Sequence, residues 1–424
     1  MSYHPSIASP NADDSRSSNG QPLAEKLVVL GVTGSIAAYK AVHIARLLIK
    51  AGAVVQVVMT ERAKQFVGPA TFAGITGRPP ATSMFEPTDG GESHVSLAAK
   101  ADLIVIAPAT ADMLARLVQG RADDLLTATA LCAESRLLIA PAMHPSMWAH
   151  PATKRNVTQL KADGVLFVGP ECGEVASGDQ GEGRMSEPER IVATIRGLLA
   201  ERDLEGRHIV VTAGPTVEDI DPVRFITNRS SGKMGFAIAE RAADRGARVT
   251  LIAGPVALPT PYGVKRIDVR AALELQLALD GALGDDLNGA DALIMAAAVA
   301  DYRVASVADA KLKRDADSTN LSLIKNPDLL ATIGRRRTKP WPILIGFAVE
   351  TANDEAIIAL GREKLHKKCI DVVVANHAAE ALGADSNRVW LVTETEQQLV
   401  STAPKLVVAD AILGWLARSF AERS

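Results

Sequence analysis

Cysteine is scarce in this sequence, and the cysteines that it has stand far apart. The 424 residues contain three of them, Cys132, Cys172 and Cys369. An odd number of widely spaced thiols argues against a disulfide framework and favours a reducing compartment, which predicts a cytoplasmic protein. We expect any cysteine with a chemical role to act as a thiol.

Long apolar runs and a charge of one sign are also missing. Two of the longest apolar runs, residues 103–109 and 292–300, are far shorter than the ~20 residues that cross a bilayer. The formal net charge of -3 gives no electrostatic reason to expect nucleic acid. Residues 1–22 are polar, lack the apolar stretch of a secretory signal, and are predicted to be a disordered tail. Neither membrane nor nucleic-acid partners are expected.

The chain is too long for one hydrophobic core, and one pattern occurs in it twice. Residues 26–34 and 208–214 are each typical of a buried strand that ends at a glycine, and each precedes a helical pattern and a second strand. Both halves therefore predict an α/β, Rossmann-like domain with a parallel sheet. We place these domains at residues 23–200 and 207–424, with a linker at 201–206.

Two nucleotide-binding fingerprints are absent from the glycine-rich turns. The turn from Gly31 to Lys40 has no Gly-x-Gly-x-x-Gly, which disfavours a nicotinamide-linked oxidoreductase. Gly232-Lys233 is not a Walker A site, because Thr227 replaces the required glycine and Met234 the required Ser or Thr. The first turn could present backbone N–H groups at a helix start to a phosphate. A tight turn without a ligand would have the same sequence.

Two further segments of the N-terminal half follow predicted strands. They are Ala107-Pro-Ala-Thr-Ala-Asp112 and Pro141-Ala-Met-His144, and the carboxyl ends of strands are where open α/β sheets bind ligands. With the glycine turn, over about residues 25–190, they resemble the homo-oligomeric flavin-containing cysteine decarboxylases of the phosphopantothenoylcysteine type. The resemblance implies an FMN site at a subunit interface and FMN contacts from Gly34, Ser35, Thr60, Ala109, Thr110 and Ala111.

The same resemblance implies a catalytic histidine and a decarboxylation. His94 matches the family's catalytic histidine, although a lone histidine is more often structural. In the family's chemistry, oxidation of the substrate thiol with FMN turns the neighbouring carboxylate into that of a β-thioketo acid, which loses CO2 easily. The resulting enethiol must be protonated and reduced. A flap cysteine commonly gives that proton, since a thiol with a pKa of about 8.5 can release one at neutral pH.

The flap of this chain departs from the family pattern. Ser177 stands where many relatives have the cysteine, and His144 stands where many have an asparagine that contacts the substrate carboxylate. An imidazole can still donate that hydrogen bond. The proton donor is then Cys172, which lies upstream in the same loop, or a histidine or water. The alternative is a flavin-binding scaffold with weak or no decarboxylase activity.

The polar segment from Thr212 to Gly235 is the most specific in the chain, and it resembles the phosphopantothenate-cysteine ligases almost without interruption. The resemblance implies that Asn228 binds the acyl intermediate and that Arg224 lies beside the substrate. Ala296-Ala-Ala-Val-Ala-Asp-Tyr302 and the following Lys311 resemble the family's nucleotide strand and catalytic lysine. The implied CTP contacts are Met295, Ala296, Ala297, Asp301, Lys311, Pro327, Asp328, Leu329, Leu330, Phe347, Lys364 and Lys368, with Asp301 also the implied Mg2+ ligand.

The two resemblances imply consecutive steps of coenzyme A biosynthesis. The carboxylate of 4'-phosphopantothenate attacks the α-phosphorus of CTP, and L-cysteine then displaces CMP from the acyl cytidylate. Lysines and Mg2+ neutralise the triphosphate and the charge that develops on it. The product is the N-acyl cysteine that the N-terminal half converts to 4'-phosphopantetheine. The preference for CTP over other nucleotides follows from the resemblance alone.

Overall fold

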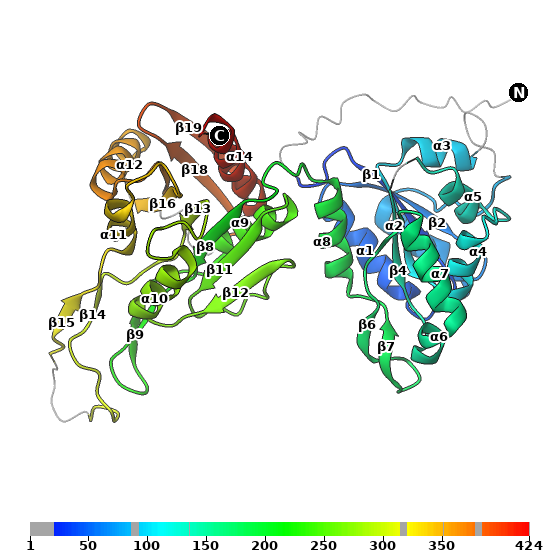
Figure 1. Ribbon diagram of the computed structural model, residues 1–424, viewed down its shortest axis with the longest axis horizontal. Helices are drawn as coiled ribbons and strands as arrows, with labels where there is room; N and C mark the ends of the chain where they lie inside the picture. Colours follow the sequence, from blue (N-terminus) through cyan, green and yellow to red (C-terminus); the bar gives the residue numbers. More distant parts are fainter. Residues whose placement is uncertain are drawn as a thin grey trace, which may run out of the picture.

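The computed structural model describes residues 21–85, 93–134, 136–313, 320–350, 352–377 and 384–423. These residues form two lobes, each built around its own main sheet (Figure 1). Of the predicted N-terminal tail, residues 1–20 lie outside the described part of the chain. No helix among the described residues is both long enough and apolar enough to cross a membrane.

The N-terminal lobe contains a parallel five-stranded sheet in the order β2-β1-β3-β4-β5. Its central strands are almost entirely buried because helices cover both faces. One face packs against α1, α2 and α8, and the other against α3, α4, α5 and α7. The bounds are β1 (Leu27–Val32), α1 (Ala38–Lys50), β2 (Val54–Met59), η1 (Ala63–Gln65), α2 (Pro69–Thr76), α3 (Ser93–Lys100), β3 (Leu103–Ala109), α4 (Ala111–Val118), α5 (Leu125–Leu131), β4 (Leu137–Pro141), α6 (Pro145–Ala149), α7 (Pro151–Ala162), β5 (Leu166–Phe167) and α8 (Pro188–Leu199).

The predicted flap is an antiparallel hairpin outside the main sheet. Its strands are β6 (Glu171–Glu174) and β7 (Gln180–Arg184), and it projects from the N-terminal lobe in Figure 1. The backbone N–H of Met143 donates to the carbonyl of Gly183 at 3.0 Å. This bond fixes the hairpin against the segment that follows β4.

The C-terminal lobe contains an eight-stranded sheet in the order β12-β11-β8-β13-β16-β17-β18-β19. The sheet is parallel as far as β17, as predicted, and then ends in the antiparallel strands β18 and β19. It is therefore mixed overall. The strands are β8 (His208–Ala213), β11 (Arg248–Ala253), β12 (Val264–Asp268), β13 (Ala292–Met295), β16 (Ile343–Glu350), β17 (Val372–His377), β18 (Ser386–Val392) and β19 (Gln397–Pro404).

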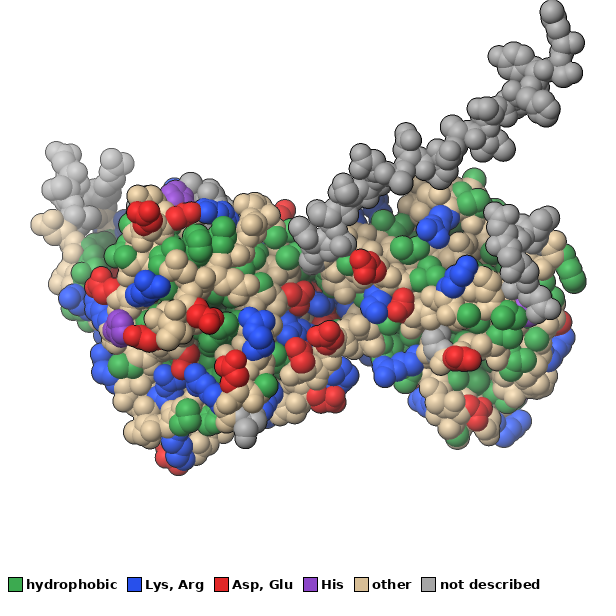
Figure 2. All heavy atoms as spheres, turned by 90° about the horizontal axis from the view of Figure 1, so that it is seen from above, with side chains coloured by type: hydrophobic (Ala, Val, Ile, Leu, Met, Phe, Trp, Pro, Cys, Tyr) green, Lys and Arg blue, Asp and Glu red, His purple; other side chains and the backbone are tan. Residues whose placement is uncertain are grey.

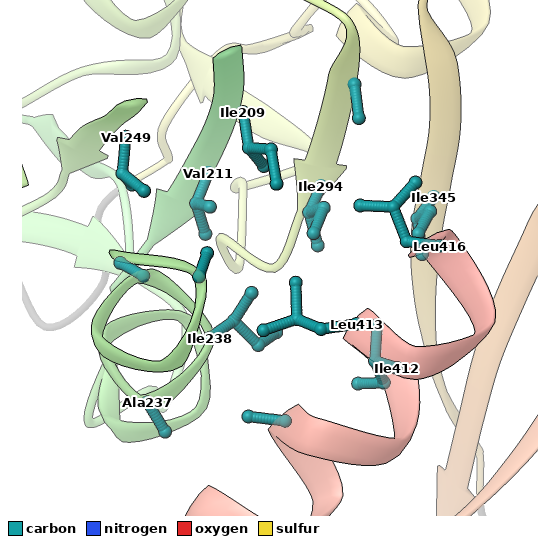
Figure 3. Packing of buried hydrophobic residues seen from close by; sticks show 14 of the residues in the cluster. Ile209, Val211, Ala237, Ile238, Val249, Ile294, Ile345, Ile412, Leu413 and Leu416 are labelled. Atoms are coloured by element: carbon teal, nitrogen blue, oxygen red, sulfur yellow. The ribbon is translucent and has the colours of Figure 1, made fainter. Parts of the chain in front are cut away.

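Helices cover both faces of this second sheet as well. Figure 3 shows one core, in which Ile238 of α9 and Leu413 of α14 meet Val211 and Ile294 from the strands. The opposite core lies under α10, α11 and α12. The helices are α9 (Lys233–Asp244), α10 (Ala272–Leu283), α11 (Leu329–Arg336), α12 (Asp354–Lys368) and α14 (Lys405–Arg423), and two small hairpins pair β9 (Val217–Asp219) with β10 (Phe225–Thr227) and β14 (Tyr302–Val304) with β15 (Leu323–Lys325).

The two lobes touch through α8 and α9. Arg196 of α8 forms ion pairs with Glu240 and Asp244 of α9, the latter at 3.0 Å. Leu204, in the predicted linker, is fully buried in the C-terminal core. Elsewhere the charged side chains of both signs are interspersed over the face seen in Figure 2.

Candidate active sites

The first candidate site is a cavity of about 610 Å³ at the carboxyl ends of β13, β16 and β17 in the C-terminal lobe. Open α/β sheets bind their ligands at this edge. Its lining includes most of the residues predicted for the ligase: Asn228, Met295, Ala296, Ala297, Asp301, Pro327, Asp328, Leu329, Leu330, Phe347, Lys364 and Lys368.

Local backbone geometry brings the polar segment to this cavity. Gly232 caps α9 in the left-handed region, with φ 74°, which a residue without Cβ adopts at little cost. The side-chain amide of Asn228 donates to the carbonyl of Val299 at 2.9 Å, and that of Asn326 donates to the carbonyl of Ala300 at 2.8 Å. These hydrogen bonds connect the polar segment, the loop after β13 and the residues before α11, which together form one wall of the cavity.

The two lysines predicted on one helix face do lie together. In α12, Lys364 contacts Glu350 at 2.7 Å and Lys368 contacts Asp328 at 3.1 Å. Both ammonium groups are partly exposed and reach the cavity. Such ion pairs are weak, so an anionic ligand can draw these lysines into contact with itself.

The wall residues that were not predicted as site residues include two lysines and two asparagines. Lys233 and Lys405 begin α9 and α14, and Asn376 and Asn387 lie on β17 and β18. Burial lowers the pKa of Lys405, the nearby charge of Lys233 lowers it further, and Asp385 opposes both. Lys233 lies within the polar segment from Thr212 to Gly235. No neighbouring sequence motif identifies Lys405, Asn376 or Asn387 as a site residue.

Arg224 and Lys311 lie outside the lining of this cavity. The Arg224 guanidinium binds Asp221 at 2.5 Å and the carbonyl of Leu312 at 2.8 Å, while Asp221 also accepts the backbone N–H of Leu312. Burial alone would raise the pKa of Asp221, but Arg224 and three backbone N–H groups hold it well below its usual range. Arg224 thus helps to fix the segment that carries Lys311, whose side chain is exposed.

The second candidate site is a cavity of about 710 Å³ in the N-terminal lobe, enclosed by the start of α1, the start of α4, the segment after β4 and the flap. Thr110 caps α4 by accepting the N–H of Met113. Met143 and Met147 add apolar wall. Predicted residues in the lining are Gly34, Ser35, Thr110, Ala111 and His144, together with Ser177.

Other residues predicted for this site lie outside its lining. Ala109 is fully buried at the end of β3, and Thr60 bonds through its backbone N–H to Val32 at 3.1 Å. His94 lies on α3, away from the lining. Cys172 is exposed and lies on β6, further from the flap turn than the lining residue Glu174. The structure therefore brings Ser177 and His144 to the cavity, and not Cys172.

His144 and Ser177 meet at one carboxylate. The Nε2 atom of His144 and the Oγ atom of Ser177 each lie 2.8 Å from Oδ2 of Asp179. The hydrogen bond with His144, and then that from Ser177, lower the pKa of Asp179. The Nδ1 atom of His144 accepts the N–H of Ser146, which leaves Nε2 to carry the proton that faces Asp179.

Comparison with known proteins divides the chain in the same way. The family model described as Flavoprotein matches residues 16–200, and the model described as DNA/pantothenate metabolism flavoprotein C-terminal domain matches residues 204–420. The crystal structure of the FMN-dependent cysteine decarboxylase SpaF is 40% identical, with a TM-score of 0.35, and the match covers 38% of this chain and 91% of that one.

Two curated relatives match nearly from end to end. The coenzyme A biosynthesis bifunctional protein CoaBC of Vibrio cholerae is 42% identical over 93% of this chain and 98% of its own length. The CoaBC protein of Mycobacterium tuberculosis is 45% identical over 92% of this chain and 97% of its own. The chain therefore belongs to the CoaBC family of bifunctional coenzyme A biosynthesis enzymes, a flavoprotein decarboxylase joined to a ligase, which confirms the resemblance that its motifs carried.

Proposed function

We propose that the C-terminal cavity joins 4'-phosphopantothenate to L-cysteine at the expense of CTP, and that the N-terminal cavity decarboxylates the product to 4'-phosphopantetheine. The observation that carries this proposal is the single cavity that gathers the distant ligase residues Asn228, Asp301 and Lys368. Two of the substrates, 4'-phosphopantothenate and CTP, are anions. The wall supplies four lysines, which suits the binding of a triphosphate.

In the proposed ligase site, the lysines, Asn228 and the segment that carries Lys311 have different roles. Lys233, Lys364, Lys368 and Lys405 hold the phosphates and stabilise the charge that develops when the carboxylate attacks the α-phosphorus. Asn228 binds the acyl cytidylate, and the segment held by Asp221 delivers Lys311 to the phosphates. L-cysteine then displaces CMP.

Asp301 is the proposed Mg2+ ligand. Its exposed carboxylate lines the cavity, and no cluster of three possible metal ligands occurs among the described residues. This donor set fits Mg2+, which commonly binds one or two carboxylates together with substrate phosphates rather than a cage of protein ligands.

The N-terminal cavity fits FMN. Backbone and hydroxyl groups of Ser35 and Thr110 stand at helix starts, which favour a phosphate, and Ile36, Met143 and Met147 offer apolar surface for a ring system. Bound FMN supplies the oxidation and reduction at the substrate sulfur-bearing carbon. His144 holds the substrate carboxylate, and Gly34 and Ala111 complete the binding wall.

We propose that a second copy of the chain completes the flavin site. Ile36 and Tyr39 border the cavity and are each 62% exposed, and His94 and Thr60 lie outside it. A homo-oligomer would bury this apolar edge and could supply the missing wall. The three cysteines are free and exposed, which fits the reducing cytoplasm that we propose as the location.

Coupled turnover tests the proposal. The purified chain is given 4'-phosphopantothenate, L-cysteine, CTP and Mg2+, and CMP and CO2 are measured together. We expect both in equal amounts. No CMP with CTP would overturn the ligase assignment, and an equal yield of AMP from ATP would overturn the preference for CTP.

The scaffold alternative is tested anaerobically with 4'-phosphopantothenoylcysteine. A scaffold would retain the yellow FMN and release no CO2. The comparisons give no support for this alternative.

A further inference from the structure

The flap contacts the start of α6 at the edge of the proposed decarboxylase site, and what this contact does rests on that proposed function. His144 precedes α6 and Ser177 lies in the flap turn, yet both direct hydrogen-bond donors at the same oxygen of Asp179. Both donor residues line the cavity, whereas Asp179 stands outside the lining with its side chain 59% exposed. The pair is thus a carboxylate-binding unit at the cavity edge.

The other charged donors of this cavity are engaged elsewhere. Lys40 is 6% exposed and donates to the carbonyl of Met185 and to Glu187. Arg184 binds the same Glu187 at 2.5 Å. Both cations are therefore already paired, and a ligand carboxylate would have to compete with Glu187 for either of them.

The substrate of a decarboxylase must place a carboxylate in this cavity. The hydrogens of His144 Nε2 and Ser177 Oγ cannot be given at full strength to two carboxylates at once. Whatever binds the pair from inside the cavity must therefore weaken or break its bonds to Asp179. Because the pKa of Asp179 is lowered by these same two donors, Asp179 is ionised at neutral pH and competes as a carboxylate.

We propose that Asp179 is an internal placeholder for the substrate carboxylate: it occupies the His144–Ser177 donor pair in the ligand-free chain, and the substrate displaces it. The flap is thereby held to α6 until a carboxylate arrives. The serine at position 177 accordingly serves as a carboxylate-binding donor, a task that needs no acidic thiol.

The backbone of the turn does not depend on the Asp179 side chain, which makes the proposal testable. The carbonyl of Asp179 accepts the N–H of Val175 at 3.0 Å, and Gly178 closes the turn through its own N–H. Asp179→Asn keeps these bonds and removes the charge. Glu182→Gln is the matched control, because Glu182 lies on the same hairpin, pairs with Lys154 and does not line the cavity.

The experiment is calorimetric binding to the FMN-loaded chain of two ligands that cannot react. One is the substrate analogue with a hydroxyl in place of the thiol, which keeps the carboxylate. The other is the same molecule without the carboxylate. For Asp179→Asn we expect the first ligand to bind about threefold more tightly, as for weakening of a competing, exposed hydrogen bond to a charged group, and the second to bind as in the unaltered chain. Ser177→Ala should weaken only the first ligand, by about threefold to tenfold.

Each result decides the matter. Unchanged or weaker binding of the carboxylate ligand by Asp179→Asn overturns the placeholder, as does an equal gain in Glu182→Gln. Equal gains for both ligands would point to a general charge effect and overturn it too. If neither ligand binds the unaltered chain, the proposed substrate of the N-terminal cavity fails, and the placeholder fails with it.

Discussion

The two cavities differ in how completely one chain builds them. In the C-terminal lobe, twelve of the fourteen predicted ligase residues line a single cavity. The exceptions, Arg224 and Lys311, lie on two segments that the hydrogen bond from Arg224 to the Leu312 carbonyl joins. In the N-terminal lobe, His94, Thr60, Ala109 and Cys172 lie outside the cavity that Ser35, Thr110 and His144 line. One edge of a single sheet thus gathers most of the predicted ligase residues within one chain. A site at the surface of its lobe is left with an exposed apolar border.

The largest expected effect tests the completeness of the ligase cavity. Asn228→Ala removes the amide that would bind the acyl cytidylate, and we expect CMP formation to fall by about 100-fold, as for loss of one donor to a developing charge. CO2 release from added 4'-phosphopantothenoylcysteine should stay the same. Asn353→Ala removes a helix cap outside the cavity and serves as the control. Equal CMP formation in Asn228→Ala would remove this residue from the site.

The next effect concerns the segment beside the ligase cavity. Asp221→Asn weakens the clamp on Arg224 and Leu312, and a displaced Lys311 should lower the rate of CMP formation by about tenfold. Asp219→Asn breaks only the partly exposed pair with Arg270 and should have no such effect. If both variants behave alike, the clamp does not position Lys311.

The contact between the lobes should have a smaller effect, on stability. Arg196→Met leaves the buried Asp244 with Arg241 as its remaining ion-pair partner, which we expect to cost about 2 kcal/mol. Thermal unfolding followed by calorimetry should then separate into two transitions. Arg202→Met, which breaks only an exposed pair with Glu205, is the control. A single, unshifted transition would show that this contact does not couple the lobes.

The ligase lobe should also respond to pH through His208. Burial lowers the pKa of His208, the charge of Arg248 adds to this, and the hydrogen bond to the Gly289 carbonyl opposes it. The unfolded chain therefore binds the proton more readily, so stability is lost as pH falls below the unfolded pKa of about 6.5 and towards the lower folded pKa. His208→Gln should lack this slope when the free energy of unfolding is measured against pH. An identical slope in both proteins contradicts the assignment.

The smallest expected effect separates the candidate proton donors of the decarboxylase. Cys172→Ala should release CO2 at the unaltered rate, because Cys172 does not reach the cavity. His144→Ala, the comparison variant, should slow the reaction. Single-turnover CO2 release from holoenzyme measures both, and a slow Cys172→Ala would return the thiol to the mechanism.

The sequence anticipated the elements that have a simple period. Apolar runs predict strands at residues 54–59 and 292–295, and β2 and β13 occupy these residues. Helical spacing predicts helices at 35–51, 191–200 and 235–245, and α1, α8 and α9 differ from these ranges only near their ends. Both patterns record burial directly. The antiparallel edge formed by β18 and β19 was not predicted. Strand direction depends on the connection and the neighbouring strand, and neither is encoded within the strand itself.

The residues of the two sites likewise fall into those that the sequence could identify and those that it could not. The polar segment from Thr212 to Gly235 and the turns after β1 and β3 could be identified from sequence alone, since consecutive residues there line the cavities. Lys405, Asn376 and Asn387 could not, because three separate elements bring them to the cavity wall. Nor could sequence show that His144 and Asp179, at the ends of different elements, would meet.

Local periodicity was sufficient to predict the pair of α/β domains, and the resemblance carried by contiguous motifs implied the family and the two chemistries. Only the folded chain shows which lysines surround the C-terminal cavity, that Cys172 lies outside the N-terminal cavity, and that Ser177 and His144 share one carboxylate. Hydrogen bonds act over about 3 Å, and only the folded chain brings residues so far apart in sequence within that distance.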